Sequence, residues 1–412
     1  MRLLVISYFS PADKITGGFR AVSFTKYFPE AGIDISLITS NSKIKDDTDM
    51  IQKYNLKTVE ITRSIRIRNI GYKIKVLALL ELLKLDSFLF FPDIFRFWNR
   101  RALKKCQKML DEQKMDAILV TAPPHSSFYF AAKLAKKNNL PLILDYRDPL
   151  SGSPYMFFPP IIKQLVRRKE KKIVNEAKIL VTVGEECAKL ISDTLSLKDR
   201  PIQVIYNGYY EEDKLEVSVE KSNKFTISYF GHFYTLRQKG FEALARGIKL
   251  LVTKYNLSPE DIALQYAGKT SRKTLQKILD SAGIADYFND LGLLSNETLF
   301  REISKSILNV VLIPPKTTYT LPTKIYDYAY SNSHILLIGE EGEVSKWCKK
   351  VDQQYTHAEI EPEKLTETLW KLYSEWKTGS LNYGCDFQKL KTFSRKNLAI
   401  HYAEIIKHEL GS

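Results

Sequence analysis

The sequence predicts an α/β protein made of two doubly wound parallel-sheet domains that face each other across a cleft. Three observations lead to this fold class. The chain has 412 residues, too many for one small core. Short apolar segments alternate with helical segments, and the alternation restarts in the second half. A polar stretch rich in Glu, Lys and Ser, residues 207–224, separates the two halves.

The first half begins with a βαβ unit: an apolar strand at Arg2–Ser7, a helix near Phe19–Ala31 and a strand at Asp34–Thr39. Helices are expected at Ser127–Lys137 and Glu185–Leu195. The further strands expected in this half are Thr58–Thr62, Asp116–Thr121, Pro141–Asp145, Lys178–Val183 and Ile202–Tyr206. Apolar strands of this kind are typical of parallel sheets covered on both faces.

The second half repeats this plan without repeating the sequence. A strand at Phe225–Phe230 precedes a helix near Phe241–Tyr255, and the tail Asp386–His408 has the pattern of one amphipathic helix. The other expected strands lie near Ile262–Tyr266, Ile307–Ile313 and His334–Ile338. We therefore expect Rossmann-like domains at 1–206 and 225–385, a linker at 207–224 and a final helix within 386–412.

The net charge of +15 is concentrated in two segments. Residues 61–110 hold 12 Lys and Arg against 3 Asp and Glu, and residues 161–172 hold 6 against 1. Within about 70–110, basic and aromatic residues are mixed with apolar runs. This pattern suits a helix pair on an anionic membrane surface, or an insertion packed on the N-terminal domain. No helix-turn-helix, RNA-recognition or zinc-finger pattern is present, so we expect no nucleic-acid partner.

The cysteines indicate a reducing compartment. Cys106, Cys187, Cys348 and Cys385 are far apart and form no CxxC pair, which disfavours a thiolate zinc site. No apolar run reaches the roughly 18 residues needed to span a bilayer. We expect a cytoplasmic protein, peripheral at the inner face of the membrane.

The segment Leu321–Gly339 is the first candidate site. It follows an apolar strand and a Pro-rich loop, so Thr323 falls at a helix start and can cap it. Lys324 supplies a charge for phosphate and Asp327 a carboxylate for a sugar hydroxyl. The alternative is an ordinary crossover in which Lys324 and Asp327 form a surface ion pair.

A second candidate phosphate site is the loop Gly231–Gly240, which carries Arg237 and Lys239 between a strand and a helix. The loop with Gly17 and Gly18 holds the same position in the first half and leaves room for a ligand. It lacks the GxGxxG fingerprint of dinucleotide sites, and a plain turn is its alternative.

Two further clusters follow strand ends of the first half. His125 could bind a sugar hydroxyl or cap the next helix. Asp145, Arg147 and Asp148 could contact an acceptor or form an ion-pair cluster that fixes a loop. The DxD spacing at 47–49 lies in a polar turn and is interpreted as solvated surface, so no metal site is predicted.

Taken in order, these motifs resemble bacterial GT-B glycosyltransferases of the family 4 type, in particular those of capsule, exopolysaccharide or lipopolysaccharide assembly. The matching segments are Thr16–Gly18, TAPPHSS at 121–127, LDYRDP at 144–149, RKEKKIVNEAKILVTVGEE at 168–186, VIYNGY at 204–209, YFGHFYTLRQKGFEAL at 229–244 and LPTKIYDYAY at 321–330.

The resemblance implies a retaining, metal-independent transfer from a nucleotide-diphosphate sugar to a saccharide acceptor that is lipid-linked. It implies phosphate contacts for Arg237, Lys239 and Lys324, a ribose contact for Asp327, and donor or acceptor contacts for Gly17, Gly18 and His125. The last helix would pack back on the N-terminal domain. No cofactor is implied beyond the donor.

One position departs from the family. An acidic residue that usually touches the sugar is replaced by Tyr319. This leaves open an inactive GT-B-like protein that binds a polysaccharide or acts as a scaffold. A nucleotide-sugar epimerase on the same fold is the other alternative, although no acid/base carboxylate set for it is evident.

Overall fold

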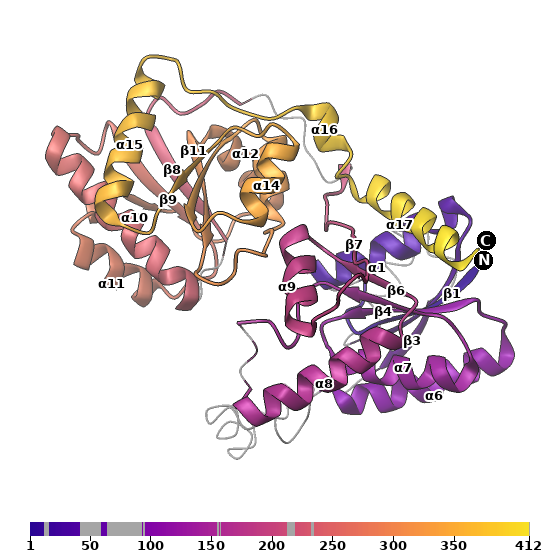
Figure 1. Ribbon diagram of the computed structural model, residues 1–412. Coiled ribbons are helices and arrows are strands. Elements are labelled where there is room, and N and C mark those ends of the chain that lie inside the picture. The colour runs from indigo at the N-terminus through magenta and orange to yellow at the C-terminus, as the bar shows by residue number, and fades with distance from the viewer. Residues whose placement is uncertain are drawn as a thin grey trace. The chain divides into compact units, whose positions relative to one another are not determined.

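The computed structural model describes residues 1–11, 16–41, 59–63, 93, 95–154, 156, 158–211, 219–231 and 235–411. The chain divides into two compact units, Met1–Asn207 with Arg395–Ser412, and Gly208–Ser394 (Figure 1). Each unit is built on its own parallel sheet with helices packed against it, so the predicted fold class is confirmed.

The first unit contains a seven-stranded sheet, within the described residues, in the order β3-β2-β1-β4-β5-β6-β7. Every neighbouring pair is parallel. The strands are β1 (Arg2–Ser7), β2 (Asp34–Asn41), β3 (Val59–Arg63), β4 (Ala117–Ala122), β5 (Leu142–Tyr146), β6 (Ile179–Thr182) and β7 (Gln203–Val204). Strands β4 and β5 are buried along their whole length, as their apolar sequences require.

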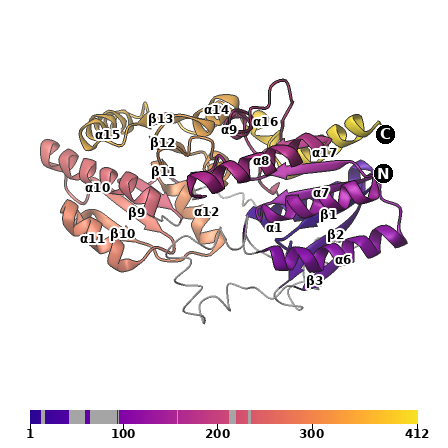
Figure 2. The same ribbon diagram turned by 60° about the horizontal axis from the view of Figure 1, so that its bottom comes forward.

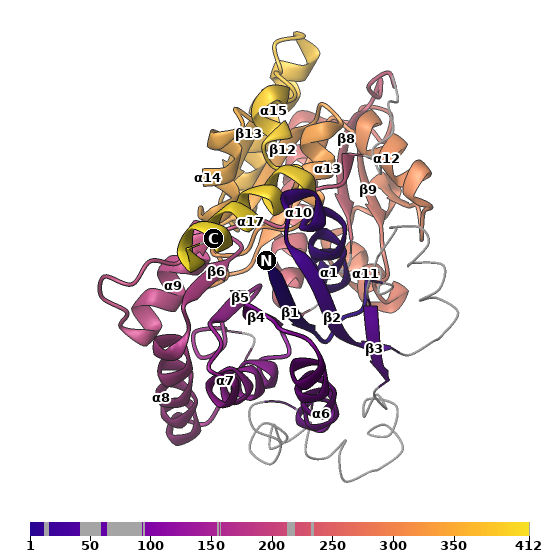
Figure 3. The same ribbon diagram turned by 90° about the vertical axis from the view of Figure 1, so that its right-hand side faces the viewer.

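Helices cover both faces of this sheet. On one face α1 packs beside α17, and on the other α6, α7 and α8 lie next to one another (Figures 2 and 3). Their bounds are α1 (Thr16–Tyr27), α6 (Arg96–Glu112), α7 (Ser126–Asn138), α8 (Pro160–Glu176), α9 (Glu185–Leu195) and α17 (Arg395–Leu410), with a 3-10 turn at Pro29–Ala31. Helix α6 buries Trp98, Ala102, Cys106 and Met109, which recur every three or four residues on one face.

The second unit contains a six-stranded sheet, again within the described residues, in the order β10-β9-β8-β11-β12-β13. Its strands are β8 (Phe225–Phe230), β9 (Ile262–Ala267), β10 (Phe288–Asp290), β11 (Leu308–Ile313), β12 (His334–Gly339) and β13 (Tyr355–Ala358). Its helices are α10 (Thr235–Tyr255), α11 (Arg272–Ala282), α12 (Asn296–Lys305), α13 (Lys324–Tyr330), α14 (Glu343–Lys350), α15 (Pro362–Lys377) and α16 (Phe387–Lys391), with a 3-10 turn at Ala285–Tyr287. Helices α10 and α15 pack closely together over the core.

The structure corrects several predicted boundaries. Helix α10 begins at Thr235, six residues before the predicted start. The tail forms two helices, and the chain rejoins the first unit at Arg395 rather than at residue 386. The break lies at residues 392–394, where each backbone N–H bonds to the carbonyl oxygen three residues back rather than four, and α16 contacts α13 in the second unit. The predicted insertion before residue 93 lies outside the described residues.

Candidate functional site

The carboxyl ends of three strands of the first sheet gather the predicted residues of that unit. Strands β1, β4 and β5 are neighbours, and Ser7, Thr121 and Asp145 share one register across them. Ligands of doubly wound folds bind outside this edge of the sheet. The segments that follow these strands carry Gly17, His125 and the predicted cluster Asp145–Asp148.

Asp145 forms a buried ion pair with Arg20 of α1. Arg20 Nη2 and Nε donate to the two carboxylate oxygens at 2.7 and 3.2 Å. Arg20 Nη1 also donates to the carbonyl oxygens of Ile205 and Tyr206, each at 3.0 Å. The sequence interpretation missed Arg20. The signal in the sequence is an arginine among the apolar residues Ala21, Val22 and Phe24 of one helix, and all of these are buried.

His125 is almost entirely buried, with 3% of its surface exposed. Its Nε2 lies 2.9 Å from the carbonyl oxygen of Asp148, so Nε2 is the protonated nitrogen. Burial lowers the pKa of His125 to about 4, which keeps the ring neutral at physiological pH. The ring therefore holds the segment after β5 in place, while the side chain of Asp148 is exposed.

Two acids that the sequence interpretation missed fix the same segments. Asp93 accepts a bond from Ser126 N at 2.8 Å and another from the Ser126 hydroxyl, which anchors the start of α7 beside His125. Glu170 of α8 accepts a bond from Ser151 N at 3.1 Å. Burial raises the pKa of both carboxyls. Neither acid stands in a strand-end motif, so sequence alone gave no reason to place them here.

Gly17 and Gly18 lie inside the first turn of α1, not in the loop that the sequence predicted. Both are buried. A Cβ atom at Gly17 would collide with Nη1 of Arg147 and with the Phe9 ring. Glycine at position 17 thus allows the guanidinium to rest against the beginning of a helix.

In the second unit, Lys324 turns its ammonium toward the sheet. Nζ donates to the carbonyl oxygens of Phe230 at 3.2 Å and Val310 at 3.3 Å, and lies 3.9 Å from the centre of the Tyr229 ring. Burial, with a smaller contribution from the charge of Arg237, holds the pKa of Lys324 well below its usual range. Lys324 thus joins α13 to the end of β8 and the middle of β11, and it lies near Arg237.

The other predicted residues of this unit are distributed over two helices. Arg237 and Lys239 lie on α10 rather than in a loop; Arg237 is half-buried and Lys239 is exposed. Gly231 directly follows β8 and has φ +125°, a conformation that favours glycine. Asp327 is half-buried in the first turn of α13.

The predicted Thr323 cap is wrong, because Thr323 makes no side-chain capping bond. Its backbone is already helical, with φ −61° and ψ −25°. The first turn is closed by backbone bonds from Ile325 N to the Pro322 oxygen and from Tyr326 N to the Thr323 oxygen. Tyr319, the departure from the family pattern, is a buried residue with 4% of its surface exposed.

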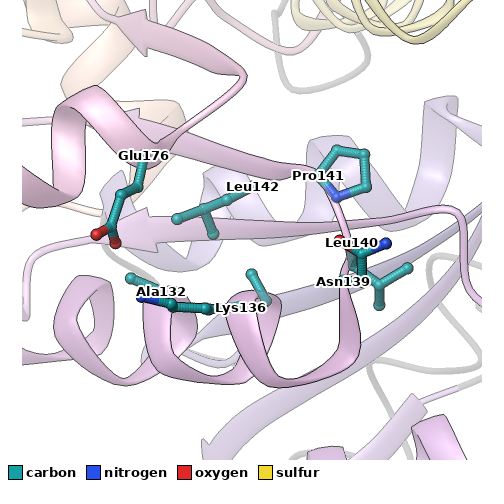
Figure 4. Close-up of a pocket in the computed structure, with 8 residues that line it drawn as sticks. Ala132, Lys136, Asn139, Leu140, Pro141, Leu142 and Glu176 are labelled. Atoms are coloured by element: carbon teal, nitrogen blue, oxygen red, sulfur yellow. The ribbon is translucent and has the colours of Figure 1, made fainter.

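A cavity of about 430 Å³ lies at the opposite edge of the first sheet (Figure 4). It is bounded by α7, by the start of β5 at Leu142 and by Glu176 at the end of α8. None of the predicted site residues lines it. Leu142 is the first residue of β5, whereas Asp145 lies near the carboxyl end of that strand, so the cavity and the predicted residues are at opposite ends of β5.

The described residues contain neither a candidate metal site nor a candidate membrane-spanning helix. No group of three or more His, Cys, Asp or Glu there could hold a metal ion. No described helix combines the length and hydropathy that a bilayer crossing requires. The DxD at 47–49 falls outside the described residues. None of the four cysteines, which are all described, forms a disulfide.

Comparison with known families identifies the first unit. A family model described as Glycosyltransferase Family 4 matches residues 19–212, which run from α1 to just past the end of that unit. The N-terminal unit is therefore similar to Glycosyltransferase Family 4 over most of its length. No curated protein matches the sequence of the chain.

The similarity to solved structures covers both units, whereas the Family 4 match covers only the first. HepE of Anabaena in complex with UDP is 13% identical, with a TM-score of 0.64 over 99% of both chains. The lipopolysaccharide outer core galactosyltransferase WaaB is 13% identical, with a TM-score of 0.62 over 99% of this chain and 100% of that one. Sucrose-phosphate synthase from Thermosynechococcus elongatus is 9% identical, with a TM-score of 0.66 over 100% and 99%. At identities this low, the structural similarity shows the fold alone, and that fold is GT-B.

Proposed function

We propose that the protein is a glycosyltransferase that moves a sugar from a nucleotide-diphosphate sugar to a saccharide acceptor. The observation that carries this proposal is the Family 4 match at 19–212 in a chain with a GT-B fold. HepE, which shares the fold, was solved with UDP and with UDP-glucose. A donor of the same chemical class suits the cations of the second unit.

The donor diphosphate is assigned to the carboxyl edge of the second sheet. Arg237 lies in the first turn of α10, which carries no acidic side chain, so its charge and the helix dipole act together. Lys324 lies nearby at the end of β8, and a bound diphosphate would raise its lowered pKa and favour the charged ammonium. Departure of the nucleotide concentrates negative charge on the leaving phosphate, and fixed cations lower the energy of that transition state. Asp327 is proposed to bind ribose.

We further propose that the transfer retains the anomeric configuration, needs no metal ion and serves cell-surface polysaccharide synthesis. These assignments follow from the family resemblance, in which positive side chains and helix ends replace a metal at the diphosphate. Proton NMR of the glycosidic product tests retention, because the anomeric coupling distinguishes the two configurations. An inverted product, or activity abolished by EDTA, would contradict these parts of the proposal.

The acceptor is proposed to be lipid-linked, with the protein peripheral at an anionic membrane on the cytoplasmic side. Two helices that pack on either side of α7 support this. The outer face of α8 exposes Ile161 by 76% and Leu165 by 45%. Exposed basic residues follow on the same helix at Arg167, Arg168, Lys169 and Lys172, and α6 exposes Arg100, Arg101, Lys104, Lys105 and Lys108. Apolar side chains beside cations suit an anionic lipid surface.

Turnover of a panel of UDP, GDP and TDP sugars tests the activity. We expect one donor to release nucleotide in the presence of a saccharide acceptor, with and without EDTA. Release of no nucleotide from any donor would favour the scaffold. Interconversion of a UDP-sugar without acceptor would favour an epimerase. UDP-GlcNAc 2-epimerase from Methanocaldococcus jannaschii shares the fold of this chain at 12% identity, with a TM-score of 0.54.

Flotation with phosphatidylglycerol vesicles tests the membrane surface. Serine at Ile161 and Leu165 together should reduce binding, since both side chains are exposed and contribute little to the core. Serine at Leu250, which is 41% exposed on α10, is the matched control. Equal binding by all three proteins would refute the role of α8.

A further inference from the structure

Arg147 is a buried cation held rigidly at the carboxyl edge of the first sheet. Only 8% of its surface is exposed. Its Nη2 donates to the carbonyl oxygen of Pro123 at 2.5 Å, and its Cζ lies 5.2 Å from the centre of the Phe9 ring. Burial lowers the pKa of Arg147 to about 10, so the guanidinium remains charged at pH 7.

No carboxylate among the described residues forms an ion pair with this guanidinium. Asp145 directs both of its oxygens to Arg20. Asp148 exposes its side chain and holds its position through its carbonyl oxygen, which bonds to His125. The Arg147 Nε atom is buried without a hydrogen-bond partner. The charges of Asp148 and Asp145 offset the burial of Arg147 only in part, since neither carboxylate bonds to it, and a bound anion would offset more of that cost.

The first turn of α1 adds a second positive region at the same place. Nη1 of Arg147 lies against Gly17, close enough that a Cβ there would collide with it. Helix α1 has 12 residues and no acidic side chain in its first turn. The positive end of a helix and a guanidinium repel each other, and an anion bound beside both would relieve that repulsion. Both features therefore point to a ligand with negative charge.

We propose that Arg147 and the first turn of α1 bind a phosphate or diphosphate group carried by the acceptor. The inference rests on the proposed glycosyltransferase function and deepens it by naming the acceptor class. The donor diphosphate is assigned to Arg237 and Lys324 in the second unit, so this cation of the first unit serves the other substrate. A planar guanidinium can form paired hydrogen bonds to phosphate oxygens.

Binding to the full chain tests this assignment without requiring turnover. The probes are geranyl diphosphate and glucose 1-phosphate, titrated calorimetrically with the nucleotide site saturated by the preferred nucleotide. We expect Arg147→Met to weaken binding of the preferred probe about ten- to a hundredfold, since a bond to a charged group is lost. Nucleotide affinity should change by less than about twofold, as for distant independent sites.

Two further variants keep the test decisive. Lys133→Met removes an exposed cation from α7 and should leave all affinities unchanged. Arg147→Lys keeps the charge but cannot form the paired bonds, so it should give an intermediate loss even if Arg147→Met does not fold. Preference for geranyl diphosphate identifies a lipid diphosphate acceptor, and preference for glucose 1-phosphate a phosphorylated sugar; either supports the site.

The outcomes separate this inference from the proposed function. Unchanged binding of both probes in Arg147→Met and Arg147→Lys overturns the inference and leaves the glycosyltransferase assignment intact. A parallel loss of nucleotide affinity also overturns it, because Arg147 would then serve the donor. Failure of the wild-type chain to bind any nucleotide or nucleotide sugar would instead defeat the proposed function.

Discussion

The carboxyl edges of the two sheets organise their charged groups differently. In the first unit Asp145, Glu170 and Asp93 are tied to a buried cation, a backbone amide and a serine, and His125 is neutral. In the second unit Lys324 turns to two carbonyl oxygens and Arg237 stands near it. The first edge is braced by its own ionisable residues, whereas the second concentrates positive charge. The same backbone plan can therefore surround one proposed anion contact, Arg147, with paired ionisable residues, or place cations side by side.

The largest expected effect comes from breaking the buried ion pair between Arg20 and Asp145 in the first unit. Arg20→Met should lower the free energy of unfolding by about 3–5 kcal/mol, because it leaves the Asp145 carboxylate buried and unpaired. Chemical denaturation measures this. The matched control is Asp34→Asn at the exposed Arg2–Asp34 pair, which should cost less than about 1 kcal/mol. Similar small losses in both variants would mean that the edge is not braced as described.

His125 should make the stability of the first unit depend on pH. Its folded pKa of about 4 lies below the unfolded value of 6.5, so the unfolded state binds more protons between these values. The contribution of His125 is complete above about pH 6.5 and is lost as the pH falls, by about 3 kcal/mol at pH 4. His125→Gln should remove this part of the pH dependence. A wild-type and variant difference that stays constant from pH 7 to 4 would contradict it.

Arg237 should matter for turnover rather than for folding. Arg237→Met should reduce kcat about a hundredfold, as expected when a donor that stabilises a developing charge is lost. The unfolding free energy should change by less than about 1 kcal/mol, since the residue is only half-buried. Arg246→Met on the same helix is the control. Arg246 is exposed and has no assigned role, so the rate should fall less than about fivefold.

Lys324 should combine both effects. Lys324→Met removes the donor to the Phe230 and Val310 carbonyl oxygens, so the unfolding free energy should fall by about 1–3 kcal/mol. Turnover should fall as well, because the charge beside Arg237 is lost. Denaturation and steady-state kinetics on one preparation separate the two. A lower rate at unchanged stability would mean that the ammonium acts on the ligand alone.

Much of the architecture could be predicted from local pattern. Strand β8 spans Phe225–Phe230 as expected, because its continuous apolar run is buried on both faces. The edge strands β10 and β13 were missed because they are short and partly exposed, so their sequences carry no apolar run. Helix α10 was started too late, because Gly240 lies in its second turn and glycine is unfavourable inside a helix.

The sequence by itself determined the doubly wound plan, the two-unit division of the chain and the choice of strand ends that carry His125, Arg147 and Asp327. These follow from periodicity and from residues next to each other in the chain. Only the tertiary structure decided what those side chains touch. Arg20 meets Asp145 across 125 positions of the chain, and Lys324 reaches Phe230 across 94. Such pairings depend on which strands become neighbours in the folded sheet. Burial then makes an unpaired charge costly, so a buried charge needs a partner in the protein or in a ligand.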